Sequence, residues 1–180
     1  PQNNILIYGF LLMMNFATIG IIIDWSPVWL TKDLGAPLFL GGLVIMFFNG
    51  GEIIARVSGS NLINKCGEIV IGCYFSIIAC IILFISIFTM NLYIILSGII
   101  IFGFGTANFI AIVLRQAISE TNETISLTIS NLLTLGFGGF IFGPVIVGYL
   151  AEFMGLTFNM YLLSFICLLY TSDAADEYDR

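Results

Sequence analysis

Residues 48–67 decide the fold and read Phe48-Asn49-Gly50-Gly51-Glu52-Ile53-Ile54-Ala55-Arg56-Val57-Ser58-Gly59-Ser60-Asn61-Leu62-Ile63-Asn64-Lys65-Cys66-Gly67. The stretch begins inside a long apolar segment, carries an acid and a base at i,i+4 spacing, and ends in a short polar turn. A charge within a membrane is costly and usually marks function or a sheltered contact. The turn also holds much of the scarce positive charge, so it should fix which way the chain faces in a membrane.

The composition around this stretch is that of a membrane protein. Hydrophobic residues make up 59% of the chain and charged residues 9%, against roughly 25% charged residues in a soluble domain. Apolar runs of about 20 residues recur along the chain, and each is long enough to cross a hydrocarbon core of about 30 Å. The sequence therefore predicts an all-α protein with several membrane-spanning helices.

Turn chemistry divides the chain into six apolar segments. We expect helices at about residues 4–30, 37–62, 68–89, 91–116, 124–151 and 156–170. Pro37 suits the first turn of the second helix, Gly67 ends that helix, and Asn91 can cap the fourth. Residues 116–123 form the longest expected polar loop.

The polar residues are unevenly shared among these segments. The third and sixth segments are nearly bare, whereas the other four carry most glycines and the residues Asn15, Asn49, Glu52, Asn108, Arg115 and Asn131. Two sets of three segments, each with two polar members and one apolar member, indicate a repeated three-helix unit. We expect the third and sixth helices to face lipid while the other four line an interior.

The basic residues predict the orientation. Alternate loops place Arg56, Lys65 and Arg115 on one side and Lys32 on the other, so the first side and the N-terminus should be cytoplasmic. Aromatic residues that suit an interfacial belt fall near the expected outer ends, and they are Trp25, Trp29, Tyr93 and Tyr149.

Glu52 and Arg56 share one face of the second segment, toward its cytoplasmic end. A charge at the centre of a span costs about 2.5–3.5 kcal/mol on insertion scales. The two side chains must therefore pair, face protein or reach the headgroups. One interpretation is a simple pair in which Arg56 reaches the interface, and the other is a latch of a cytoplasmic gate.

Glycines concentrate in the fifth segment. Gly139 and Gly143 form G-x-x-x-G, which allows close approach of two helices. Pro144 removes a backbone hydrogen bond, so Gly143-Pro144 could give a bend that is useful for gating. Close helix packing alone would also explain the pattern.

Four asparagines are the candidates to contact a polar solute, because an amide in hydrocarbon needs partners. Asn15 and Asn49 fall near mid-membrane, and Asn108 and Asn131 lie toward the cytoplasmic side. Interhelical hydrogen bonding is the alternative for each of them. Near the outer end, Asp24 either faces water or belongs to an outer closure with Lys32 or Glu152.

The sequence disfavours an enzyme and predicts no cofactor. It contains no histidine and no cluster of cysteine and carboxylate at metal-ligand spacing. No nucleophile sits beside an evident base, no phosphate-binding loop appears, and no basic patch indicates nucleic-acid binding.

Two motifs resemble the major facilitator superfamily. Residues 60–67 are similar to its G-x-L-x-D-R-x-G loop, with Lys65 and Gly67 in place, Ser60 for Gly and Asn64 for Asp. Glu68 stands where a base is usual. Asp24-Trp25-Ser26-Pro27-Val28-Trp29-Leu30 is similar to a D-W-S-x-x-aromatic-L stretch of a bacterial branch of sugar-permease-like and efflux-like members.

The resemblance, which covers residues 1 to about 166, implies the C-terminal six-helix half of a twelve-helix transporter built from inverted three-helix repeats. The expected partners are the lipid bilayer, the missing N-terminal half, and a small-molecule solute, alone or with a coupled proton. The expected location is the bacterial inner membrane, and the expected mechanism is alternating access. A non-transporting membrane scaffold or a channel-like six-helix protein is the alternative.

The end of the chain differs in character. Cys167-Leu168-Leu169-Tyr170-Thr171-Ser172-Asp173-Ala174-Ala175-Asp176-Glu177 resembles the translation of a transposase-type sequencing adapter. We therefore expect residues 167–180 to be a non-native tail.

Overall fold

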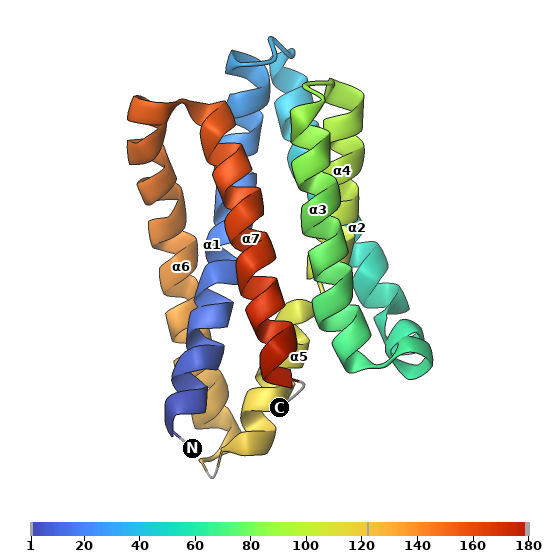
Figure 1. Cartoon of the computed structure of the whole chain (residues 1–180), viewed down its shortest axis with the longest axis vertical. Helices are drawn as coiled ribbons and strands as arrows, with labels where there is room; N and C mark the ends of the chain where they lie inside the picture. Colours follow the sequence, from blue (N-terminus) through green and yellow to red (C-terminus); the bar gives the residue numbers. More distant parts are fainter. Residues whose placement is uncertain (1, 122, 179–180) are drawn as a thin grey trace.

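The protein is a bundle of helices that run roughly side by side (Figure 1). The computed structural model describes residues 2–121 and 123–178, and it describes the side chains of residues 5–121 and 123–172. The described residues contain only helices and connections. The elements are α1 (Gln2–Lys32), α2 (Leu38–Cys66), the π-helical turn η1 (Val70–Tyr74), α3 (Phe75–Phe88), α4 (Leu92–Thr106), α5 (Phe109–Glu120), α6 (Ile125–Met154) and α7 (Leu156–Tyr178).

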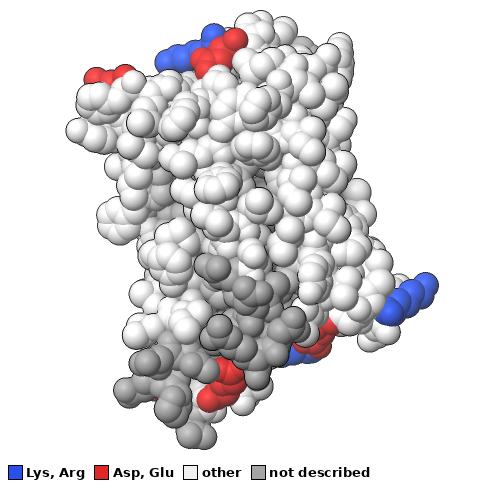
Figure 2. Space-filling model, in the orientation of Figure 1, with Lys and Arg blue, Asp and Glu red and all other residues white. Residues whose placement is uncertain are grey.

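Five helical stretches in the described residues are long and apolar enough to cross a membrane. They are Ile5–Lys32, Leu38–Cys66, Val70–Phe88, Leu92–Glu120 and Ile125–Met154, and a shorter apolar helix covers Leu156–Ser172. Charged atoms gather toward the two ends of the bundle, and an uncharged band separates them on the face shown in Figure 2. This distribution matches a hydrocarbon core with polar boundaries on either side. The chain is an all-α membrane protein.

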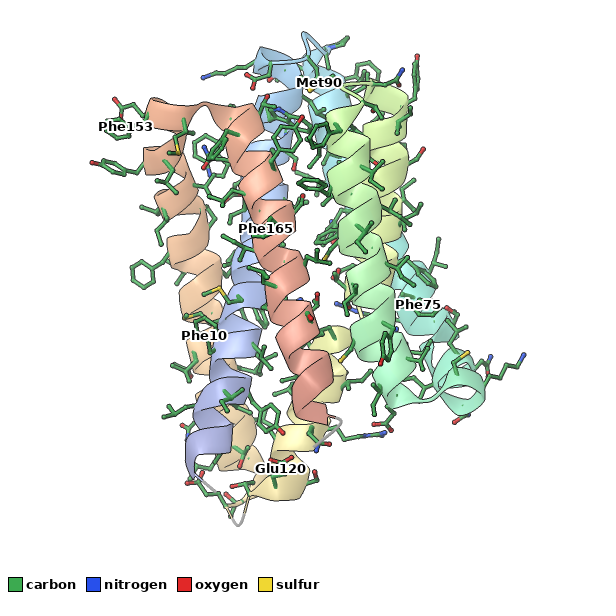
Figure 3. The ribbon with its side chains drawn as sticks, viewed as in Figure 1. Phe10, Phe75, Met90, Glu120, Phe153 and Phe165 are labelled. Atoms are coloured by element: carbon green, nitrogen blue, oxygen red, sulfur yellow. The ribbon has the colours of Figure 1, made fainter. Side chains whose placement is uncertain are left out.

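The two ends of the bundle can be told apart by their connections. The Lys32 end holds Lys32, Met90 and the α6–α7 reversal at Gly155, and the Glu120 end holds Glu120 and the Gly67 turn (Figure 3). Gly67 (φ 89°) and Gly155 (φ 80°) adopt positive φ angles that favour glycine.

The capping residues expected from the sequence lie where helices begin and end. The Asn91 side chain accepts hydrogen bonds from the backbone N–H groups of Tyr93 and Ile94, which confirms the predicted cap of α4. Pro37 immediately precedes α2, and Gly67 follows its last residue.

Two expected boundaries were wrong, and one expected helix is interrupted. The fourth segment forms the span Leu92–Glu120, but its helix breaks at Ala107 and Asn108, between α4 and α5. The expected polar loop at 116–123 is shorter, since α5 continues to Glu120. The last helix runs beyond residue 170 to Tyr178, through the expected tail, whose residues 179–180 lie outside the described part of the chain.

The break between α4 and α5 is held by a neighbouring helix. Ser76 on α3 donates a hydrogen bond to the carbonyl oxygen of Gly105 at 3.0 Å, and its side chain is fully buried. A side chain at Gly105 would meet the carbonyl oxygen of Phe75 at 2.7 Å. The close approach of α3 therefore fixes where the helix turns.

Glycine creates two close helix pairs in the bundle. Gly139 on α6 lies against the backbone of Met13 on α1, and Gly143 on the same helix lies against Ala17. In the second pair, Gly51 on α2 lies against the backbone of Ile100 on α4, and Gly103 on α4 lies against the backbone of Phe48. The helices α3 and α7 pack against one another, and each also contacts one of the close pairs.

Candidate functional site

The Glu52 and Arg56 side chains form an ion pair along one turn of α2. Arg56 Nη2 donates to Glu52 Oε1 at 3.3 Å. The Arg56 side chain is 58% exposed and the Glu52 side chain only 12% exposed. The arginine thus reaches outward, while the carboxylate lies half-buried within a membrane-spanning helix and depends on this partner for its charge.

The polar turn that follows presents its side chains outward at the Glu120 end. Ser60, Asn64 and Lys65 are exposed on the last turns of α2. Glu68 forms an ion pair with Arg115 on α5, which sequence reasoning did not pair. Position 68, where the family motif usually has a base, is therefore an acid that ties the turn to a distant helix.

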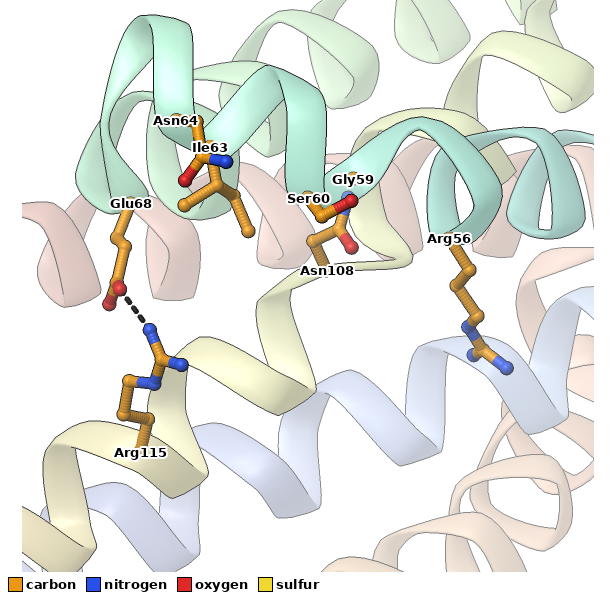
Figure 4. Close-up of a pocket in the computed structure, with 8 residues that line it drawn as sticks. All are labelled: Arg56, Gly59, Ser60, Ile63, Asn64, Glu68, Asn108 and Arg115. Atoms are coloured by element: carbon orange, nitrogen blue, oxygen red, sulfur yellow. Dashed lines mark hydrogen bonds and ion pairs between the residues drawn. The ribbon is translucent and has the colours of Figure 1, made fainter.

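A cleft opens between the end of α2 and the α4–α5 break, with a volume of about 360 Å³. Figure 4 shows the Glu68–Arg115 pair at one side of the cleft and Arg56 at the other. Asn108 projects between them, beneath Gly59, where an added Cβ would lie 2.9 Å from Asn108 Oδ1. The residues that line the cleft are Arg56, Gly59, Ser60, Ile63, Asn64, Glu68, Asn108 and Arg115.

The four candidate asparagines occupy different environments. Asn15 is buried inside the bundle and donates to the Tyr170 hydroxyl at 3.2 Å, and its Oδ1 has no hydrogen-bond partner among the described residues. Asn108 packs in the cleft described above. Asn49 is half-buried and donates to the Ile45 carbonyl of its own helix, and Asn131 is exposed on α6. Of the four, only Asn15 is fully buried, whereas Asn49, Asn108 and Asn131 keep some exposed surface.

At the Lys32 end, the structure shows an interhelical network that sequence reasoning missed. Trp29 Nε1 donates to Thr157 Oγ1 at 2.8 Å, and Thr157 Oγ1 donates to Asp33 Oδ2 at 2.6 Å. The Thr157 backbone N–H also donates to Asp33 Oδ2, at 3.1 Å. The expected acids, Asp24 and Glu152, are both exposed, and no ion pair to Lys32 is found for either among the described side chains.

Pro144 sits inside α6, and its carbonyl oxygen accepts a hydrogen bond from Trp25 Nε1 at 2.8 Å. An added Cβ at Gly148 would meet the Trp25 ring at 2.7 Å. The indole of α1 therefore bonds to α6 at the Gly143-Pro144 step and packs against Gly148, one turn beyond. The D-W-S motif supplied this tryptophan, but the sequence did not indicate its partner.

Glu120 is the centre of a second unpredicted contact, at the other end of the bundle. Its Oε1 accepts hydrogen bonds from the Tyr8 hydroxyl and from Gln116 Nε2, both at 2.7 Å. The contact joins α1 to the end of α5 (Figure 3). The sequence held no signal for this contact, since Tyr8 and Glu120 are 112 positions apart.

The chemistry of the described side chains is that of ion pairs and amides. They include no group of three or more His, Cys, Asp or Glu residues that could hold a metal ion. The arrangement consists of polar side chains at the ends and on the exposed faces of membrane-spanning helices. Such a bundle belongs to the class of polytopic membrane proteins.

Of three curated proteins similar to this chain, two are named as transporters and one as a membrane protein. An uncharacterized MFS-type transporter of Yersinia pestis is 24% identical over 174 residues, which are 97% of this chain and 45% of the relative. Membrane protein MosC of Rhizobium meliloti is 26% identical over 152 residues, 84% of this chain and 37% of its own length. The uncharacterized transporter y4wD of Sinorhizobium fredii is 20% identical over 152 residues, 84% of this chain and 40% of its own length.

The similarity to an MFS-type transporter confirms the resemblance to the major facilitator superfamily that the two motifs predicted. No family model matches the chain. The chain spans less than half the length of the curated relatives it matches, between 37% and 45%.

Proposed function

We propose that this chain forms the C-terminal half of a secondary transporter that moves a small solute across the membrane by alternating access. The observation that carries the proposal is the alignment of almost the whole chain with under half of an MFS-type transporter. A relative of that length has room for a second bundle of similar size. The missing N-terminal half is then the expected partner in the membrane.

The exposed faces of α2 and α6 support a protein partner rather than lipid alone. These two helices are the least buried of the five long spans. Only 28% of the most apolar stretch of α2 and 33% of that of α6 is buried inside the bundle. The exposed face of α6 carries Ser130, Asn131 and Thr134. The Thr134 hydroxyl donates to the Ser130 carbonyl of its own helix. An amide such as Asn131 that faced hydrocarbon would lack partners, and a second half with a water-filled cavity between would provide them.

The packing of the helices agrees with a repeated three-helix unit. In a repeated unit the first span, α1, corresponds to the fourth, which begins with α4, and the second span, α2, corresponds to the fifth, α6. The close pair of α1 with α6 then corresponds to the close pair of α4 with α2. The third and sixth spans, α3 and α7, pack together. We assign these two to the lipid side and the exposed faces of α2 and α6 to the interior.

The Glu120 end is then the cytoplasmic end, by the bias of Arg56, Lys65 and Arg115. Glu52, Arg56 and the turn at 60–67 lie at this end and would form part of the closure beneath the solute. The Glu68–Arg115 pair holds the turn against α5. Gly143-Pro144 would allow α6 to flex as the closure opens.

The solute-contacting role of Asn131 is tested by replacing it with leucine in the complete transporter. We expect uptake into proteoliposomes of a solute that the wild-type protein accumulates to fall about tenfold, because a buried hydrogen bond contributes about 0.5–1.5 kcal/mol and the solute group it served is left unpaired. Ser97→Leu is the matched control, since Ser97 is exposed on α4 among apolar neighbours. Equal uptake by the wild-type protein and Asn131→Leu would remove Asn131 from the solute path.

A further inference from the structure

An apolar groove lies between α6 and α7, with α1 as its floor. Its volume is about 240 Å³. α1 contributes Ala17 and Thr18, α6 contributes Gly143 and Ile146, and α7 contributes Asn159 and Ile166. The two walls follow one another in the chain and are joined at Gly155, and both pack along α1 (Figure 1).

The groove holds one polar side chain that is incompletely satisfied. Asn159 is 1% exposed, and its Nδ2 donates to the Gly155 carbonyl at 2.7 Å. Its Oδ1 has no hydrogen-bond partner within the described part of the chain. The second polar group, Thr18 Oγ1, donates to the Met14 carbonyl at 2.9 Å. A hydrogen-bond donor of an occupant that reached this atom would therefore pair an acceptor that is otherwise unpaired.

The groove has the polarity of one membrane leaflet. Asn159 lies in the first turn of α7, at the Lys32 end, where a span meets the headgroups. Ile166 lies about 10 Å further along the helix axis, toward the centre of the bilayer, and one leaflet of hydrocarbon is about 15 Å thick. The acceptor thus lies at the level of the lipid headgroups, and the apolar walls lie at the level of the acyl chains.

We propose that this groove is a binding site for one phospholipid of the leaflet at the Lys32 end. An acyl chain fills the groove between Ile146 and Ile166. A headgroup N–H or O–H donates to Asn159 Oδ1, so lipids with a donor are preferred over phosphatidylcholine, whose headgroup has none. Gly143 lets α6 lie directly against Ala17 of α1, which forms the floor of the groove.

The test compares two lipids with identical acyl chains, phosphatidylethanolamine and phosphatidylcholine, on the intact transporter. The protein is delipidated in detergent and titrated with each lipid, and the bound fraction is measured by native mass spectrometry. We expect the wild-type protein to retain phosphatidylethanolamine with about threefold higher apparent affinity, which is the contribution of one hydrogen bond. Asn159→Leu should bind the two lipids equally.

A matched pair of variants tests the groove separately from its acceptor. Ile146→Trp places a large ring at the groove, whereas Ile85→Trp places the same ring at an equally exposed position of α3, a helix of the lipid side, that does not line it. We expect Ile146→Trp to lose retention of both lipids and Ile85→Trp to keep it. Unchanged lipid preference in Asn159→Leu, or equal retention by the two tryptophan variants, would overturn the proposal.

If Asn159→Leu fails to fold, the tryptophan pair decides alone, because both substitutions lie at exposed positions. Retention by Ile146→Trp at the wild-type level then rules out the site. Failure of the site would leave the proposed transport function untouched, since that function rests on the faces of α2 and α6.

Discussion

Gly51→Ala is expected to destabilise the protein by about 2–3 kcal/mol, whereas the neighbouring Gly50→Ala should be neutral or slightly stabilising. A Cβ at Gly51 would overlap the carbonyl oxygen of Ile100, and the amide nitrogen of Phe104 lies 2.9 Å away. These are backbone atoms of α4, which cannot rotate aside as a side chain would. A Cβ at Gly50 would meet nothing within 4 Å, so alanine there only favours the helix.

The same contrast recurs on the other close helix pair. A Cβ at Gly139 would overlap the carbonyl oxygen of Met13, whereas a Cβ at Gly138 would meet nothing within 4 Å. Thermal unfolding of the intact protein in detergent measures both pairs. We expect midpoints about 5–10 °C lower for Gly51→Ala and Gly139→Ala than for their neighbours. Equal midpoints within either pair would contradict the close packing of those helices.

Arg56→Ala is expected to lower transport by the complete protein by roughly tenfold. The substitution leaves Glu52, whose side chain is 12% exposed, without its partner in a membrane-spanning helix. An unpaired charge in a span costs up to about 2.5–3.5 kcal/mol, and the exposure of Arg56 reduces the effect. Uptake should be expressed per folded transporter, so that lower insertion is not counted as lost activity.

Two further variants separate the charge pair from the arginine itself. Arg56→Lys keeps the charge and should keep most of the uptake. Glu52→Gln combined with Arg56→Ala removes both charges and should recover part of the activity that Arg56→Ala loses. Full uptake by Arg56→Ala at normal expression would show that the pair has no part in a gate.

The sequence predicted the helices because, in an apolar run of membrane length, the backbone N–H and C=O groups find their hydrogen-bond partners within a helix. Caps such as Asn91 were also predictable, since their hydrogen bonds are local. The break at Ala107–Asn108 was not, because no proline marks it and its place depends on Ser76 of another helix, whose hydroxyl donates to the Gly105 carbonyl. The local sequence pattern therefore predicted the helices, whereas a tertiary contact determines where the fourth span breaks.

The candidate site could be predicted only in part, for a related reason. Asn15 and Asn131 look alike in sequence, yet the structure buries Asn15 within the bundle and exposes Asn131. Which side of a helix faces a neighbour depends on packing that a nearly uniform apolar sequence does not encode. Contacts such as Asp33 with Thr157, 124 positions apart, depend on the same packing.

Access to the middle of α2 from each side of the membrane tests alternating access most directly. A single cysteine replaces Asn49, within α2, in an intact protein that lacks other reactive cysteines, including Cys66. An impermeant maleimide is applied outside whole cells and, separately, to inverted vesicles. The rate of labelling is measured from each side, with and without Arg56→Ala.

Alternating access predicts labelling from both sides, with opposite changes when the cytoplasmic closure is weakened. Arg56→Ala should raise the rate from the cytoplasmic side and lower the rate from the outside, because one conformational equilibrium governs both. Labelling from neither side would contradict alternating access and indicate a scaffold. Rates from the two sides that rise together would also contradict it, because they would indicate an open channel.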